Sequence, residues 1–101
     1  MARLSIVNRE KKRALCVEKN KKKRTEILSI LSSVSSSIQE KNLARKRLAV
    51  MPKDSSPVRG RSRCALTGKG RSVYKQFGLG RFKLRELMMM GVVPGVVKAS
   101  W

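Results

Sequence analysis

Glycine and proline are confined to the second half of this chain, and their distribution constrains the fold more than any other feature. All seven glycines and all three prolines lie between Pro52 and Gly95. These two residue types interrupt helices more strongly than any others. The first half can therefore continue as helix over long stretches, whereas the second half must turn often. We expect a mainly α-helical protein whose C-terminal module is irregular and extended.

Apolar residues in the first half recur at helical spacing. A weak stripe predicts a helix over residues 3–19, and a clearer stripe predicts helix around residues 27–34. The basic run from Lys19 to Arg24 lies between them, and it is either a solvated helical face or a connection. If it faces phosphate, the same run becomes a clamp.

A serine-rich segment, residues 32–37, interrupts this helical pattern because serine favours turns and caps over helix interiors. Ser36 with Gln39 and Ser37 with Glu40 both form capping-box patterns, which predict a third helix over residues 37–50. Pro52 ends that helix, since the residue before a proline avoids the helical region. We expect its inward side to carry Ile38, Leu43, Ala44 and Leu48.

The second half begins with a turn cluster and an alternating segment. From Val58 to Arg63 the period of two predicts an extended strand-like segment, with Arg59, Arg61 and Arg63 on one side. These patterns divide the chain into a basic helical N-terminal arm (residues 1–51), an extended arginine-rich linker (residues 52–63) and a small module (residues 64–101).

A last helix is predicted over residues 80–90, with Leu84, Leu87 and Met88 on one face. Gly91 suits the position directly after its C-terminal cap, and Pro94 prevents the helix from resuming. We expect the three consecutive methionines, residues 88–90, to fill gaps against neighbouring groups.

The net charge is +19, from 25 basic and 6 acidic residues. Basic residues are spread over both halves, so the chain is not a neutral domain with one basic tail. Such a charge is relieved best by a polyanion, and nucleic acid is the expected partner. With 4% aromatic residues the chain has little to bury, so we expect it to complete its fold against that partner.

Several function classes find no support. Histidine is absent and the two cysteines, Cys16 and Cys64, are read as reduced thiols, so we expect no metal and no cofactor. The acids are scattered among cations without a carboxylate pair or a nucleophile–base pair, so we expect no enzyme. Residues 68–71 lack the spacing of a phosphate-binding P-loop. No signal peptide or membrane-spanning run is visible.

The aromatic residues all lie in the last part of the chain, interleaved with cations. We expect Phe77 and Phe82 to form a miniature core, and Cys64 to be a small buried hydrophobic residue. Tyr74 and Trp101 are the better candidates for contact with a partner, since aromatic faces stack on unpaired bases.

Cys64, Thr67, Gly80 and Lys83 stand at the spacing of a zinc knuckle that has lost three of its four ligands. Residues 68–75, 77–81, 84–87 and 93–101 accompany this pattern. Together they resemble the small-ribosomal-subunit protein fourteen family, in the long bacterial or organellar form that has no zinc. The resemblance is dense over residues 52–101. Zinc-bearing relatives have cysteines at these four positions, and zinc-free relatives keep a compact loop there.

The resemblance implies a structural protein that binds small-subunit ribosomal RNA in the head, the 3′ major domain, near the decoding site. It implies small-subunit proteins three, ten, thirteen and nineteen as neighbours. A bacterial cytoplasmic ribosome is the expected location, with an organellar ribosome as the alternative. The expected RNA contacts are Arg59, Arg61, Arg63, Lys69, Arg71, Tyr74, Lys75, Arg81, Lys83, Arg85, Lys98, Ser100 and Trp101. Lys21, Lys22, Lys23 and Arg24 are weaker candidates.

Two other classes of protein are also strongly basic. An architectural DNA-binding protein would need a recognition helix or wedge and a dimer interface, and neither is evident. A membrane-active cationic peptide could use the stripe at residues 27–34, but the glycine-rich second half argues against it.

Overall fold

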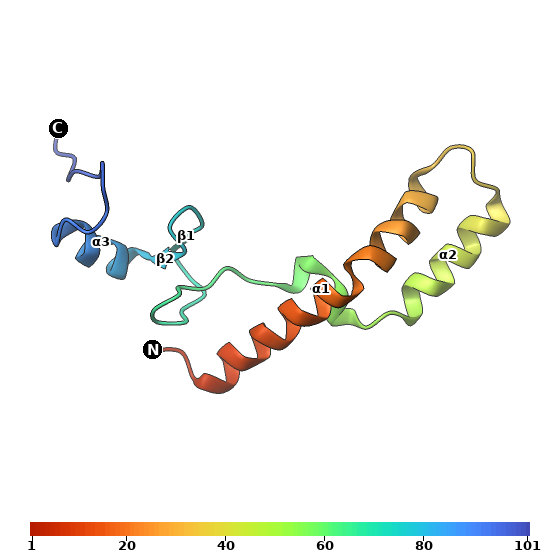
Figure 1. Ribbon diagram of the computed structural model, residues 1–101, viewed down its shortest axis with the longest axis horizontal. Helices are drawn as coiled ribbons and strands as arrows, with labels where there is room; N and C mark the ends of the chain where they lie inside the picture. The colour runs from red at the N-terminus through yellow and green to blue at the C-terminus, as the bar shows by residue number, and fades with distance from the viewer. The chain divides into compact units, whose positions relative to one another are not determined.

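The computed structural model describes all residues, 1–101, and is mostly helical with one very small sheet (Figure 1). The fold class expected from the sequence is confirmed. The elements in chain order are α1 (Leu4–Ser32), α2 (Ile38–Val50), the 3-10 turns η1 (Lys53–Ser55) and η2 (Pro57–Arg59), β1 (Val73–Tyr74), β2 (Leu79–Gly80) and α3 (Arg81–Met89). No helix has both the length and the apolar character needed to cross a membrane.

The chain divides into two compact units. We call residues 8–60 the helical unit, and residues 1–7 together with 61–101 the loop unit. The helical unit contains most of α1, all of α2 and both 3-10 turns. The loop unit contains the first turn of α1, the hairpin and α3.

In the helical unit, one continuous helix replaces the two helical stretches predicted for residues 3–34. The basic run from Lys19 to Arg24 lies inside α1, so it is a helical segment and not a connection. No glycine or proline interrupts it, and lysine and arginine are good helix formers. The serine-rich break is confirmed, since α1 ends at Ser32. Figure 1 shows α2 returning alongside the second half of α1.

The start of α2 is the predicted capping box at Ser37. The Ser37 hydroxyl accepts a hydrogen bond from the Glu40 backbone N–H at 3.3 Å, and the Ser37 N–H donates to the Glu40 carboxylate at 2.9 Å. Of the two boxes in the sequence, only this one forms. Ser36 instead shares a hydrogen bond with Ser33. Met51 is extended before Pro52, as that position requires.

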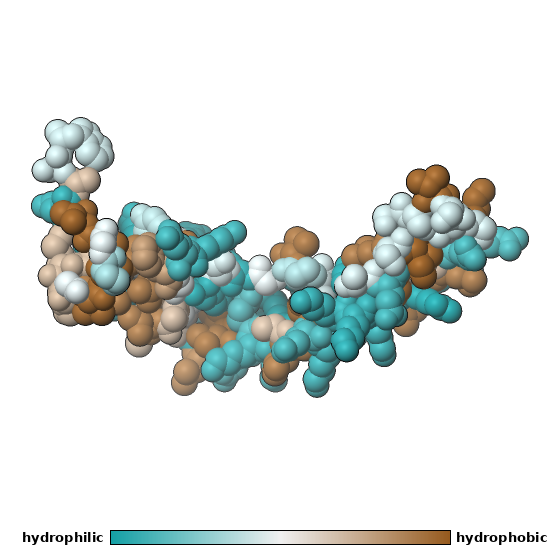
Figure 2. Space-filling model, turned by 45° about the horizontal axis from the view of Figure 1, so that its top comes forward, coloured by the Kyte–Doolittle hydropathy of each residue, from teal (hydrophilic) through white to brown (hydrophobic).

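The core of the helical unit is small, and part of its prediction is wrong. Ile27 and Ala44 are buried, but Ile38 is 78% exposed and Leu43 is 56% exposed. A groove between α1 and α2 is lined by Ile27, Ile30, Leu43 and Ala44, so the apolar surface of α2 is covered only in part. Figure 2 shows hydrophobic residues, coloured brown, at the end of the helical unit where α1 connects to α2.

The linker differs from the predicted extended segment. Residues 57–59 form a 3-10 turn, which proline favours at its first position, so the chain is extended only after it. Arg59 lies in that turn with its Nε 3.5 Å from the Asp54 carboxylate. Arg61 and Arg63 belong to the loop unit. The three guanidiniums therefore do not share the regular alternating segment that the sequence predicted.

In the loop unit, α3 has the predicted inward face. Leu84 is buried and Leu87 and Met88 are half-buried. The helix ends in a Schellman motif, with Gly91 at φ 72° and the Val92 N–H bonded to the Leu87 carbonyl at 3.1 Å.

The prediction that the consecutive methionines fill gaps is wrong for two of them. Met89 is 56% exposed and Met90 is 73% exposed. They follow the last inward position of a short helix, where nothing in the loop unit covers them.

Candidate nucleic-acid interface

Backbone hydrogen bonds close the loop that stands where a zinc knuckle would be. Cys64 donates its N–H to the Lys69 carbonyl at 2.9 Å and accepts from the Gly68 N–H at 2.8 Å. The Ala2 N–H donates to the Thr67 carbonyl at 2.9 Å, which ties the N-terminal segment to this loop. The Arg63 guanidinium donates to the Gly68 carbonyl at 3.1 Å. The turn is thus fixed by the polypeptide itself.

Glycine is required at position 68 for two reasons. Its φ of +70° is costly for any residue with a Cβ. A Cβ there would also lie 3.0 Å from a Val7 methyl carbon and 3.1 Å from the Ala2 Cβ. The loop can therefore approach the N-terminal segment this closely only with glycine.

Three of the four knuckle positions come together around the Cys64 sulfur. Cys64 is 2% exposed, which confirms its predicted burial, and a Cβ on Gly80 would lie 3.7 Å from its Sγ. A hydrogen bond from the Thr67 hydroxyl lowers the pKa of the Cys64 thiol to about 7, against the opposing effect of burial. Backbone N–H groups of Gly80, Thr67 and Leu66 act in the same direction as that hydroxyl.

The fourth knuckle position points elsewhere. The Lys83 ammonium lies 2.6 Å from the Glu86 carboxylate, one turn further along α3. No group of three or more His, Cys, Asp or Glu side chains is gathered where a metal ion could be held. The sulfur is surrounded by hydrogen-bond donors instead of further ligands.

The hairpin formed by β1 and β2, with two residues in each strand, brings together the segments that precede and follow it. Val73 pairs with Gly80 and Tyr74 with Leu79 in antiparallel register. Next to it, the Arg81 N–H donates to the Ser72 carbonyl at 3.0 Å, and Ser72 has a positive φ of 52°. This turn places Arg71 and Arg81 at the same opening.

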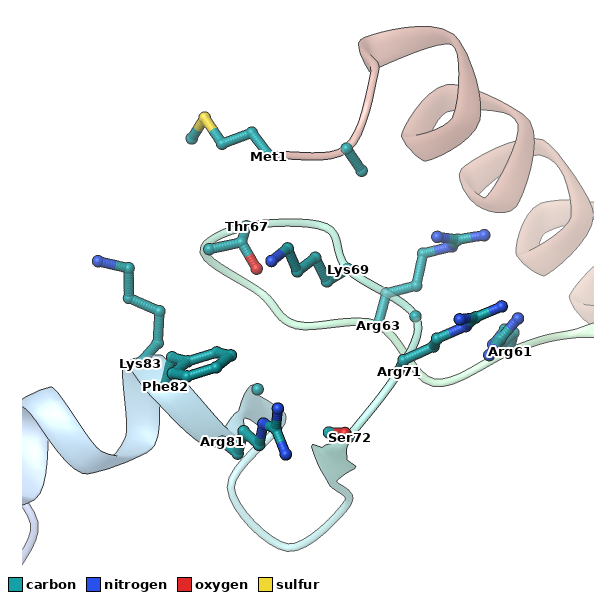
Figure 3. Close-up of a pocket in the computed structure, with 13 residues that line it drawn as sticks. Met1, Arg61, Arg63, Thr67, Lys69, Arg71, Ser72, Arg81, Phe82 and Lys83 are labelled. Atoms are coloured by element: carbon teal, nitrogen blue, oxygen red, sulfur yellow. The ribbon is translucent and has the colours of Figure 1, made fainter.

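That opening is a cavity of about 740 Å³ within the loop unit (Figure 3). Six cationic side chains line it and no acidic residue does. Lys69, Arg71 and Arg81 form no ion pair with any carboxylate of the chain. The complete lining is Met1, Ala2, Arg61, Arg63, Thr67, Lys69, Gly70, Arg71, Ser72, Gly80, Arg81, Phe82 and Lys83. We call this cavity the cationic pocket.

The prediction of a miniature core of phenylalanines is wrong. Phe82 is 61% exposed and Phe77 is 38% exposed. Phe82 stands two positions before the buried Leu84, and two helical residues are about 200° apart around the axis. It therefore faces away from the core and lines the cationic pocket. The Arg81 guanidinium lies 4.7 Å from its ring centroid and the Lys69 ammonium 5.9 Å.

The structure brings only part of the predicted contact set together. Arg61, Arg63, Lys69, Arg71, Arg81 and Lys83 line the cationic pocket. Elsewhere in the loop unit, Tyr74, Lys75 and Arg85 are exposed on the hairpin and α3, and Lys98, Ser100 and Trp101 on the C-terminal segment. Arg59 and the weaker candidates Lys21, Lys22, Lys23 and Arg24 belong to the helical unit, where Arg24 donates to the Ser55 hydroxyl at 3.2 Å.

The sequence did not predict that Phe82, Ser72 and Gly70 line the pocket, nor that Met1 and Ala2 do. Phe82 was assigned to the core, and the left-handed Ser72 left no signal beyond its place in a turn-rich stretch. Gly70 belongs to the segment 68–71, which lacks P-loop spacing, and its sequence context indicates no other role. A Cβ there would lie 3.0 Å from the Arg61 Nε and 3.2 Å from an Arg63 nitrogen, so glycine makes room for both guanidinium groups.

Comparison with known proteins agrees with the suggested resemblance. The family model of ribosomal protein S14p/S29e matches residues 47–100, just over half of the chain. Small ribosomal subunit protein uS14 of Alkalilimnicola ehrlichii is 50% identical over 101 residues, which cover both chains completely. The protein of the same name from Stenotrophomonas maltophilia is 52% identical over the same full length. The chain therefore belongs to the ribosomal protein S14p/S29e family and is a structural component of the small ribosomal subunit, not an enzyme.

Proposed function

We propose that this chain binds small-subunit (16S-type) ribosomal RNA in the head, the 3′ major domain. There it supports assembly of the head and the decoding-site region during translation. The family membership supports ribosomal RNA as the ligand, and the placement in the head is what the resemblance implies. The observation that carries the proposal is the cationic pocket, which gathers six cations without one acid.

A pocket of this charge is complementary to closely spaced phosphates. Cations held around one cavity repel each other, and phosphate groups remove that repulsion while releasing condensed counterions. Guanidinium groups add directional contacts because they bind phosphate oxygens in pairs. Lys69, Arg71 and Arg81 form no ion pair with a carboxylate, so no such pair has to break when they bind a phosphate.

The helical unit supplies surface for protein neighbours. Ile38 and Leu43 are exposed apolar residues of α2, and the groove lined by Ile27, Leu43 and Ala44 lies beside them. Small-subunit proteins three, ten, thirteen and nineteen are the partners that the resemblance implies. A bacterial cytoplasmic ribosome is the proposed location, in line with the bacterial sources of the two relatives, and an organellar ribosome is the alternative.

Sedimentation with crosslinking tests the proposal. In a gradient at moderate salt, the chain should travel with small subunits, and ultraviolet crosslinks should map to the 3′ major domain. A chain that stays off small subunits contradicts the proposal. Recovery on DNA instead would favour an architectural DNA-binding protein, and crosslinks confined to another RNA domain would refute the placement in the head.

A further inference from the structure

We infer that the cationic pocket holds one unpaired RNA nucleotide, with its base stacked on Phe82 and its phosphate among the surrounding cations. This inference rests on the proposed function and specifies what kind of RNA element the loop unit recognises. It assigns a role to an aromatic ring that the sequence alone places in the core.

Phe82 is an exposed aromatic residue that lines the cationic pocket. Phe82 is 61% exposed although Leu84, two positions further along α3, is buried, so the loop unit covers its side chain only in part. Phe82 lines the pocket together with cations on the loop and on α3 (Figure 3). Aromatic rings in such surroundings stack on bases, because every base offers a flat π-face.

Two cations lie over the Phe82 ring at different distances. The Arg81 guanidinium, at 4.7 Å from the ring centroid, is in close contact, whereas the Lys69 ammonium, at 5.9 Å, lies at the outer limit of about 6 Å for a cation–π contact. A base can displace Lys69 from the ring, and Lys69 then remains near enough to pair with the phosphate of the same nucleotide. Arg81 extends the stacking surface with its own planar group.

The size of the cationic pocket suits a single unpaired nucleotide. About 740 Å³ lies within the range of roughly 300–1,000 Å³ that small-molecule sites occupy, which suits one nucleotide and not a double helix. In a duplex both faces of each base are covered by neighbours, so a ring can stack fully only on an unpaired base. Thr67 and Ser72 line the same cavity and offer hydroxyl groups to a base edge or a 2′-hydroxyl.

The test compares Phe82→Leu with Phe77→Leu in the full-length chain. The probe is a single-stranded RNA octamer with 2-aminopurine at a central position, titrated by fluorescence and anisotropy. Phe82→Leu should lower the affinity about tenfold and abolish the stacking-induced quenching. Phe77→Leu, which removes the other exposed phenylalanine but leaves the pocket intact, should stay within about twofold of the parent.

Three further arms separate stacking from folding and from charge. Phe82→Tyr should restore the quenching, and an octamer abasic at the central position should bind the parent chain as weakly as Phe82→Leu binds the intact octamer. A duplex of the same length should bind all variants alike. Equal behaviour of Phe82→Leu and Phe77→Leu, or full affinity for the abasic octamer, overturns the inference.

Failure of the nucleotide site and failure of the proposed function give different results. If the parent chain sediments with small subunits but shows no stacking signal, only the nucleotide site is wrong. If it stays off small subunits, the proposed function is wrong whatever the octamer shows. Should Phe82→Leu lose its circular-dichroism helix signal, the comparison of the parent with Phe82→Tyr and with the abasic octamer still decides.

Discussion

The two units carry similar positive charge, but they differ in how many acidic residues lie among their cations. The helical unit contains five of the six acidic residues. Two of its cations form ion pairs with them: Arg13 with Glu10 and Asp54, and Arg59 with Asp54. The loop unit contains only Glu86, which pairs with Lys83. Lys69, Arg71 and Arg81, which line the cationic pocket, form no such pair. The net charge alone therefore does not distinguish the two units, whereas the placement of the acidic residues does.

The units also differ in what defines their backbone. The helical unit is built from long helices, one starting at a capping box, and local sequence specifies these. The loop unit depends on single residues in unusual conformations, on hydrogen bonds between distant segments, and on one buried sulfur.

Gly68→Ala should destabilise the loop unit by about 2–4 kcal/mol. The left-handed backbone costs an alanine about 1–2 kcal/mol, and the close approach to Val7 and Ala2 adds the cost of overpacking. Gly78→Ala is the matched control, since its φ is +64° with nothing within 4 Å of the new Cβ, and it should cost only about 1–2 kcal/mol. Hydrogen exchange of the Gly68 and Lys69 region measures the difference. Equal costs would show that the contact with Val7 is unimportant.

Arg71→Ala should weaken binding to ribosomal RNA more than Arg59→Ala. Arg71 lines the cationic pocket without an ion pair, and each lost charge-assisted contact with phosphate is worth about 1.5–3 kcal/mol. Arg59 is already paired with Asp54 and lies outside that pocket. Equilibrium binding to a 3′ major domain transcript measures both. A larger loss of affinity for Arg59→Ala would indicate that the RNA binds mainly to the helical unit.

Ser37→Ala should destabilise the helical unit by about 1 kcal/mol, because the capping hydrogen bond to the Glu40 N–H is lost. Ser35→Ala, in the same serine-rich stretch but outside the cap, is the control and should be close to neutral. Thermal unfolding followed by helix signal reports the loss. Affinity for RNA in the loop unit should be unchanged, and a matching loss of affinity would mean that the units are coupled.

The stability of the loop unit should rise between pH 7 and pH 9. The Thr67 hydroxyl lowers the folded-state pKa of Cys64 to about 7, below its ordinary value of 9.0, so folding favours the thiolate. That stabilisation is fully present above the ordinary value and is lost as the pH falls through about 7. Unfolding at several pH values compares the parent with Cys64→Ala, whose curve should be flatter over this window. Parallel curves would show that the thiol is not linked to folding.

Sequence predicted the structure of both units well where a local rule decided the outcome. The Ser37 box, the break before Pro52 and the Gly91 cap all formed as expected, since each depends on a few adjacent residues. The exposure of Ile38 and Leu43 was not predicted, because it depends on how many partners α2 has. Periodicity identifies an apolar side but not whether anything covers it.

The sequence predicted many of the residues of the candidate site but not how they are arranged in space. The resemblance and the charge pointed to the arginines and lysines of residues 59–85, and six of them line one cavity. Phe82 was misassigned because a ring in a small domain is expected to be buried. The grouping of Arg61 with Arg81 depends on the left-handed Ser72 and on the hairpin, which are tertiary features without a local signal.

The most direct test of the account is the salt dependence of RNA binding for two charge-matched triple variants. Arg61→Ala, Arg71→Ala and Arg81→Ala together remove three pocket cations, whereas Lys11→Ala, Lys12→Ala and Lys46→Ala remove three exposed cations of the helical unit. Each lost phosphate contact lowers the slope of log affinity against log salt by about 0.7–0.9. The pocket variant should lose about two to three units of slope on the 3′ major domain transcript, and the helical variant less than about one. Equal losses, or a larger loss for the helical variant, would contradict the claim that the acid-free pocket of the loop unit is the RNA site.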